Sequence, residues 1–381
     1  SSTHARWIGT KIRLRQSEDA LEDLATFADT HTCIHLPAWE VLPTDTMDPT
    51  DDIVAERMNA LNKLLKAQQS GIPVALAISV RSILQHVINR DQLQSDTVDL
   101  EVGGEYDLEQ LAQRFVDLGY DRELMVEERG DFSIRGGILD IFPISNELPM
   151  RIEFFGDEIE SIRCFEPETQ RSIENADSVH VLPRSEKRLL AKQHGKLSTI
   201  TEYLGDGWII ALDEPNPVLA EAQQLGEHFG NSPFMASWHD VIGKMKKTLP
   251  LSLAQVAHDA AEGTTRFKLP MRSMVSWSGK TDGFWSQLKQ WDLDGMSVRL
   301  LCHNSGERRR LMELVREQGY RPGRDAFDLK IAIGRLKEGF SSEKDKIAVL
   351  SEREMFGRKY VRRRRRRFQA GASITQFSDV T

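Results

Sequence analysis

Between Glu128 and Arg171 the chain alternates apolar and polar side chains in short runs that are separated by glycines. Alternation with a period of two is typical of β-strands that bury one face and expose the other. Gly136 and Gly156 are suited to the turns between such strands, because glycine tolerates a positive φ. The stretch therefore predicts three or four short antiparallel strands, a β-rich ribbon around which the rest of the chain must fold.

Within this ribbon Arg151, Glu153 and Phe155 alternate with Ile152 and Phe154, so they are expected on the exposed face. Arginine beside exposed aromatic rings is typical of binding surfaces, because a guanidinium bonds carboxylates and stacks on rings. A solvated sheet face is an equally good interpretation of the same charges. Both interpretations apply to the same six residues, which are Arg135, Arg151, Arg163, Arg171, Phe155 and Phe165.

On both sides of the ribbon, apolar runs of strand length alternate with helical patterns, which indicates a parallel α/β layer. A β-rich insertion between two parts of an α/β domain explains why the apolar pattern changes from helical spacing to a period of two in this stretch. Residues 230–295 carry weak signals, and mixed strands and loops are expected there. Strands are expected at 33–36, 74–79, 208–213, 297–302 and 347–350, and helices at 17–29, 53–68, 82–87, 108–118, 218–229 and 305–318.

The length of 381 residues predicts two or three domains. With 50 basic and 58 acidic residues the formal charge is −8, so a chain that coats nucleic acid along its whole surface is excluded. Cys33, Cys164 and Cys302 are far apart and lack the spacing of a zinc site, which favours buried thiols in a reducing cytoplasm. No apolar run reaches the length of a membrane span. The chain is expected to be a cytoplasmic fragment of a longer protein.

A nucleotide-hydrolysing site would need a glycine-rich phosphate loop. Gly279-Lys280-Thr281 lacks the leading glycine, because Met274 stands at that position. Asp213 and Glu214 end a strand-like run and could hold Mg²⁺ only beside phosphate-binding glycines, so a vestigial Walker B-like pair is expected rather than a working site. No pattern predicts a catalytic acid, base or nucleophile, and no catalytic residue or metal site is proposed.

Near its end the chain has the strongest concentration of positive charge. Six consecutive cations repel one another, which favours a solvated linker between domains. Contact with the phosphate backbone of DNA is the functional alternative, and it would be strongly salt-dependent. The run consists of Arg362, Arg363, Arg364, Arg365, Arg366 and Arg367.

The motif from Phe132 to Pro143, the run from Arg151 to Arg163 and the triplet Thr169-Gln170-Arg171 together resemble the N-terminal module of bacterial transcription-repair coupling factors, which is shared with the excision-repair protein UvrB. The resemblance continues outward to 36–43, 183–186 and 350–358 and covers most of the chain. It implies a helicase-like, degenerate P-loop NTPase domain with a parallel sheet, interrupted by a β-rich α+β domain that binds UvrA. The fold class expected is thus α/β.

Carried over by matching positions, Arg151 and Arg163 are the residues expected to contact UvrA, with Phe165 and Arg171 beside them. Ser161 stands where UvrB has a further arginine, which fits the coupling factors better than UvrB. The resemblance also implies that RNA polymerase and double-stranded DNA are partners of the longer protein. ATP and Mg²⁺ would belong to a DNA translocase motor outside this chain, and no cofactor is expected within it.

The expected division is 1–106 for the first part of the helicase-like domain, 107–185 for the β-rich insertion, 186–350 for the second part with an additional α/β region, and 351–381 for a basic linker towards a polymerase-binding domain. The alternative function is that of a UvrB-like subunit that binds ATP and damaged DNA. Measurable ATP hydrolysis by the chain would support this alternative, and the absent phosphate loop predicts none.

Overall fold

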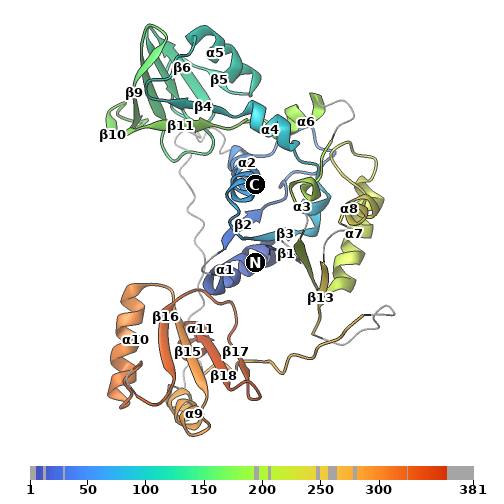
Figure 1. Ribbon diagram of the computed structural model, residues 1–381, viewed down its shortest axis with the longest axis vertical. Helices are drawn as coiled ribbons and strands as arrows, with labels where there is room; N and C mark the ends of the chain where they lie inside the picture. The colour runs from blue at the N-terminus through green and yellow to red at the C-terminus, as the bar shows by residue number, and fades with distance from the viewer. Residues whose placement is uncertain are drawn as a thin grey trace, which may run out of the picture. The chain divides into compact units, whose positions relative to one another are not determined.

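The computed structural model describes residues 6–11, 14–28, 31–192, 197–204, 207–245, 249–255, 264–277, 281–323 and 325–357. The chain divides into two compact units, Ser1–Thr264 and Thr265–Thr381. Each unit combines helices with strands, as Figure 1 shows. The mixed α/β class that the sequence predicts is confirmed.

A five-stranded parallel sheet lies at the centre of the first unit, with the strand order β13-β12-β1-β3-β2. All six residues of β3, an interior strand, are buried, because α1 (Leu14–Phe27) and α2 (Asp51–Ser70) cover opposite faces of the sheet (Figure 1). The predicted parallel layer is therefore confirmed. Its strands are β1 (Arg6–Lys11), β2 (Thr32–Leu36), β3 (Val74–Ser79), β12 (Trp208–Asp213) and β13 (Leu249–Leu253).

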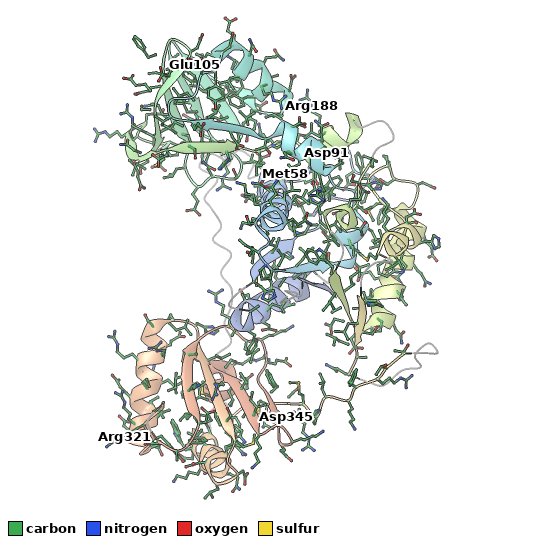
Figure 2. The ribbon with its side chains drawn as sticks, in the orientation of Figure 1. Met58, Asp91, Glu105, Arg188, Arg321 and Asp345 are labelled. Atoms are coloured by element: carbon green, nitrogen blue, oxygen red, sulfur yellow. The ribbon has the colours of Figure 1, made fainter. Side chains whose placement is uncertain are left out.

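Helix α2 (Asp51–Ser70) shows how the sequence produces this layer. Two aspartates in the first turn of α2 stabilise it, because their negative charge interacts favourably with the positive end of the helix dipole. The helix ends at Gly71, which adopts the left-handed conformation with a φ of 67°. Met58, labelled in Figure 2, is fully buried in the same core cluster as Leu76 and Ile78 of β3. Burial of such a side chain contributes about 1.5–3 kcal/mol.

The other helices of the first unit flank the sheet and its connections. The sequence predicts a helix at 82–87, whereas α3 begins at Val80 and ends at Leu84, because Ser79 caps it by accepting a hydrogen bond from the Ser82 amide at 3.1 Å. These elements are α1 (Leu14–Phe27), α3 (Val80–Leu84), α4 (Arg90–Asp96), α6 (Glu186–Lys192), η1 (Ile200–Tyr203), α7 (Pro215–Phe229) and α8 (Trp238–Lys244).

A second sheet lies between α4 and α6 in the chain, and we call this part of the first unit the insertion. It has six strands in the order β10-β9-β8-β7-β6-β5 and one helix, α5 (Leu108–Asp117). The chain enters and leaves it through an antiparallel pair, β4 (Val98–Glu101) and β11 (Ser178–Val181). The strands are β5 (Asp121–Arg122), β6 (Asp131–Arg135), β7 (Ile138–Ile141), β8 (Met150–Phe155), β9 (Glu158–Phe165) and β10 (Ser172–Ala176).

Strands β6 to β9 pair antiparallel with their neighbours in chain order, as the alternation predicts. The turns between them contain Gly136, with a φ of 61°, and Gly156, with a φ of 64°. A side chain would be strained in this conformation, so both predicted turn glycines are confirmed.

The second unit contains a five-stranded mixed sheet in the order β14-β17-β18-β15-β16. The expectation of only strands and loops at 230–295 is wrong, because two helices form there: α8 in the first unit and α9, which has 13 residues, in the second. Phe284, Leu288 and Trp291 of α9 are buried at helical spacing, and this spacing was the signal in the sequence. The elements are β14 (Arg272–Ser273), α9 (Thr281–Leu293), β15 (Ser297–Cys302), α10 (Ser305–Glu317), β16 (Leu329–Ile333), β17 (Phe340–Ser342), β18 (Ile347–Ser351) and α11 (Glu352–Phe356).

Candidate functional site

One face of the insertion's sheet packs on α5 and forms the core of this part of the chain. Phe115 of α5 contacts Phe132 of β6 edge to face, with their ring centroids 5.7 Å apart. Ile152 of β8 and Ile162 of β9 are cross-strand neighbours in the same cluster. Because side chains alternate along a strand, the residues between these apolar positions must point to the opposite face.

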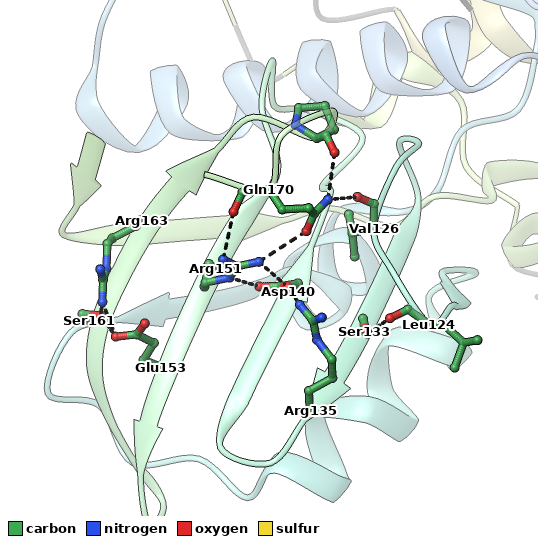
Figure 3. Close-up of polar contacts among 11 residues, drawn as sticks. Leu124, Val126, Ser133, Arg135, Asp140, Arg151, Glu153, Ser161, Arg163 and Gln170 are labelled. Atoms are coloured by element: carbon green, nitrogen blue, oxygen red, sulfur yellow. Dashed lines mark hydrogen bonds and ion pairs between the residues drawn. The ribbon is translucent and has the colours of Figure 1, made fainter. Parts of the chain in front are cut away.

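That opposite face carries two rows of polar side chains across the strands. The first row consists of Ser133, Asp140, Arg151 and Arg163, which are consecutive cross-strand partners on β6, β7, β8 and β9. In the second row Glu153 of β8 lies opposite Ser161 of β9. We call this surface the arginine face, and define it by Ser133, Arg135, Asp140, Arg151, Glu153, Ser161 and Arg163 (Figure 3).

Arg151 and Asp140 form the centre of the arginine face. The Arg151 Nε donates to Asp140 Oδ1 at 2.7 Å, and its Nη2 donates to Oδ2 at 2.8 Å (Figure 3). Arg135 donates to the same Oδ2 at 3.0 Å. The hydrogen bond to Asp140 raises the pKa of Arg151 above its ordinary value. The Asp140 side chain is 1% exposed and that of Arg151 is 15% exposed, so Asp140 orients Arg151 from beneath.

Phe165 does not lie on the exposed surface, and the prediction of an exposed ring is wrong. It is fully buried in a small cluster with Val126 and Phe142. The Arg151 guanidinium lies over this ring, 4.7 Å from its centroid. A cation above a buried ring gains a cation–π interaction, so Phe165 supports Arg151 instead of offering a contact of its own.

Gln170 links Arg151 to two loops. Its backbone has a φ of 58°, which is uncommon outside glycine. Its side-chain amide donates to the carbonyls of Val126 at 3.2 Å and Pro167 at 2.8 Å. Arg151 Nη1 donates to the Gln170 carbonyl at 3.2 Å (Figure 3). These bonds fix the loops at both sides of the arginine, which the sequence did not predict.

Arg163 is the second expected contact residue, and it is held by Glu153. The guanidinium forms an ion pair with Glu153 Oε2 and also donates to Ser161 Oγ at 3.3 Å. Ser161 in turn donates to Glu153 Oε2 at 2.9 Å. The Arg163 side chain is 35% exposed, so its charge remains accessible at the surface. The structure therefore brings Arg151 and Arg163 together on neighbouring strands.

Exposed side chains surround the arginine face. Arg171, the fourth expected contact residue, is exposed directly before β10, after the turn at 167–169. Leu124 is 92% exposed, and its carbonyl accepts a hydrogen bond from Ser133 Oγ at 3.0 Å, which holds the loop that carries it (Figure 3). Phe155 is 81% exposed beside the turn between β8 and β9. Sequence reasoning predicted Phe155 as exposed and overlooked Leu124.

Asp213 ends β12 at the carboxyl edge of the parallel sheet, and Glu214 follows it. Glu214 precedes α7 with a φ of 56°, and its carboxylate accepts a hydrogen bond from the backbone N–H of Gln255 at 2.8 Å. This contact gives Glu214 a structural partner. Among the described residues no group of three or more acidic, histidine or cysteine side chains could hold a metal ion. Gly279 and Lys280 lie outside the described residues.

The six arginines from Arg362 to Arg367 also lie outside the described residues. The prediction of a linker or a DNA contact there remains a prediction. In the described part of the chain, no helix combines the length and apolarity that crossing a membrane requires.

Comparisons with known proteins agree with the position of this site. Residues 98–186 match the family model of the UvrB interaction domain. Over 96% of its length the chain is 23% identical to the transcription-repair-coupling factor of Bacillus subtilis. It is 36% identical to that of Myxococcus xanthus over 45% of the chain, and 32% identical to that of Escherichia coli over 43%.

The chain spans 38% of the Bacillus subtilis protein and 14% of the other two. The resemblance to coupling factors and to a UvrB-like module, which the sequence motifs predict, is confirmed by these matches. The whole arginine face lies inside the matched range of 98–186.

Proposed function

We propose that this chain is the UvrA-binding part of a transcription-repair coupling factor, and that it recruits excision repair to RNA polymerase stalled at DNA damage. The observation that carries the proposal is the paired placement of Arg151 and Arg163 on neighbouring strands, each oriented by a carboxylate. Arginines held in this way are suited to bind carboxylates of a protein partner, because little side-chain entropy is lost on binding.

In this proposal the chain has no catalytic turnover of its own. The parallel-sheet domain supports the insertion, and its helicase-like ancestry accounts for the strand-end pair Asp213 and Glu214. ATP and Mg²⁺ would serve a translocase motor outside the chain, and RNA polymerase and double-stranded DNA would be partners of the longer protein. The chain would act in the cytoplasm, where these partners are found.

The test measures the affinity of the full chain for purified UvrA from the same organism by biolayer interferometry. Arg151→Glu and Arg163→Glu are each compared with the wild type. Reversal of a charge that contacts a partner carboxylate costs about 2–5 kcal/mol, so the Kd should rise by roughly thirtyfold or more. Arg188→Glu in α6 is the matched control, because Arg188 is exposed and lies outside the arginine face.

Thermal unfolding of each variant shows whether the insertion remains folded. If folded Arg151→Glu and Arg163→Glu proteins bind UvrA as tightly as the control, the arginine face is not the binding surface. If the wild-type chain itself does not bind UvrA, the proposed function is wrong.

A further inference from the structure

Helix α10 of the second unit presents a row of arginines that the proposed function does not use. Leu311 and Val315 face the core of the unit and are buried. Arg308, Arg309 and Arg316 are exposed on another side of the helix. They border a shallow hollow with a volume of about 330 Å³, which is lined by Ser305, Arg308, Arg309, Met312, Glu313 and Arg316.

The charges of these arginines are not neutralised within the protein. Among the residues that the structure describes, Arg308, Arg309 and Arg316 form no ion pair or hydrogen bond through their guanidiniums. By contrast, Arg299 on β15 of the same unit is paired with Asp328 at 2.8 Å. Glu313 contributes a single carboxylate to the described lining of the hollow. The helix therefore keeps three cations available to an external anion.

Charge is also distributed unequally between the two units. Residues 1–264 contain 24 Lys and Arg against 44 Asp and Glu, whereas residues 265–357 contain 18 against 13. The net charge of −8 conceals this difference. A positive unit in an acidic chain attracts anionic partners to one part of the molecule.

We propose that the arginine side of α10 binds the phosphate backbone of double-stranded DNA. From Arg308 to Arg316 the helix rises by about 12 Å, at 1.5 Å for each residue. A duplex presents one phosphate on each strand for roughly every 3.4 Å of its axis, so three guanidiniums along the helix can each reach a phosphate. Arginine is suited to this contact because its planar fork bonds phosphate oxygens.

The composition of the surface distinguishes duplex DNA from other anions. Single-stranded nucleic acid is bound on aromatic side chains that stack with the bases, and the described lining of the hollow contains none. A protein partner would need apolar anchors, and Met312, which is half-buried, is the one apolar side chain in that lining. Binding without dependence on DNA sequence is therefore expected.

The test uses the full chain with Arg362 to Arg367 changed to Gln, so that the arginine run cannot conceal the contribution of α10. Anisotropy of a fluorescein-labelled 20-base-pair duplex reports binding between 25 and 200 mM salt. The variant Arg308→Gln, Arg309→Gln, Arg316→Gln removes the proposed contacts. The variant Lys289→Gln, Arg310→Gln, Lys344→Gln removes the same charge from other exposed positions.

The first triple variant should bind at least tenfold more weakly than the control. The slope of log K against log salt should decrease in magnitude by about 2–3, since each phosphate contact contributes ~0.9 to that slope. Equal binding by the two triple variants overturns the proposal, as does failure of the parent chain to bind the duplex. Tighter binding of a poly-glutamate peptide than of the duplex would assign this surface to an acidic protein and would also overturn it.

Discussion

Arg151 receives its orientation from three other side chains that come from separate parts of the insertion. Asp140 on β7 bonds its guanidinium from below, Phe165 on β9 lies under it, and Gln170 holds it from a loop. An arginine that is fixed before binding loses less rotamer freedom when a partner arrives. At the scale of single residues, the candidate site is thus a supported arginine and not an exposed charge alone.

Asp140→Asn tests this support. Asp140 is 1% exposed and is unsuited to contact a partner, but it accepts hydrogen bonds from Arg135 and Arg151. Bonds to a charged group are worth about 1.5–3 kcal/mol each, so the variant should release Arg151 and weaken UvrA binding roughly tenfold. Glu160→Gln, an exposed carboxylate on β9, is the control and should leave the Kd unchanged. Lower stability with an unchanged Kd would limit Asp140 to a structural role.

Leu124→Ala tests whether the surface beside the arginines contributes to binding. Leu124 is 92% exposed, so its truncation should not alter the free energy of unfolding. Burial of a leucine against a partner is worth about 1.5–3 kcal/mol, and the Kd for UvrA should rise about tenfold. Leu293→Ala, at an 81% exposed leucine in the second unit, is the matched control. Equal Kd values for the two variants would place Leu124 outside the interface.

The residues of this site were predicted only where local periodicity determines them. Alternation along β8 and β9 placed Arg151 and Arg163 on one face, and both lie there. Burial of Phe165 depends on Val126 and Phe142, which are more than twenty residues away in the chain, so alternation could not reveal it. The role of Gln170 depends on its left-handed backbone conformation, which the neighbouring residues in the sequence do not predict.

At the scale of elements, two arginines attach the insertion to the start of α2 of the parallel-sheet domain: Arg129 pairs with Asp52, and Arg184 pairs with Asp51. Arg184 bonds Asp51 at the start of α2 and Asp121 of β5, and it also donates to the Gly130 carbonyl at 3.3 Å. Burial disfavours the charge of Arg184, but its bonds to the two aspartates more than offset this effect and raise its pKa. The turn at Gly130 therefore has to leave room for the guanidinium of Arg184.

Gly130→Ala should break the Arg184 contacts of this attachment. Gly130 has a φ of 93°, and an added Cβ would lie 2.2 Å from the Arg184 Nε. Gly103→Ala is the matched control, because its φ of 83° also lies beyond the left-handed region open to side chains while nothing lies within 4 Å of the new Cβ. Positive φ costs each variant about 1–2 kcal/mol, and loss of the Arg184 contacts should add about 1–3 kcal/mol to Gly130→Ala alone. Urea denaturation measures both, and equal losses of stability would contradict the role of Arg184.

Most helices and strands followed from apolar periodicity, but their pairing did not. The order β13-β12-β1-β3-β2 brings the first strand between two strands that lie far away in the sequence. The pair of β4 and β11 joins residues about eighty positions apart, so no local pattern could predict that it closes the insertion. Helix α9 was missed although its buried residues repeat at helical spacing, because Gly283 and several polar residues weaken the pattern.

At the scale of the whole molecule, the two units have separate hydrophobic cores as well as opposite charge. In the first unit the largest cluster includes Leu61 and Leu76, both fully buried. In the second unit Phe284, Leu300 and Leu350 are fully buried in one cluster. Cores of this kind can fold and unfold as separate cooperative units, because stability is a property of each packed cluster.

Phe284→Ala should therefore destabilise the second unit alone. Removal of a fully buried phenylalanine leaves a cavity and costs about 3–5 kcal/mol. Hydrogen exchange followed by mass spectrometry resolves the effect, because peptides from β15 and β18 report on the second unit and peptides from α2 and β3 report on the first. Under mild denaturant, exchange should accelerate roughly a hundredfold or more in β15 and β18 and stay unchanged in α2 and β3. Leu61→Ala should give the reverse pattern, since Leu61 is fully buried in the first core. Faster exchange in both units after either substitution would show that the chain unfolds as one cooperative body, and that a partner bound at the insertion would then also stabilise α10.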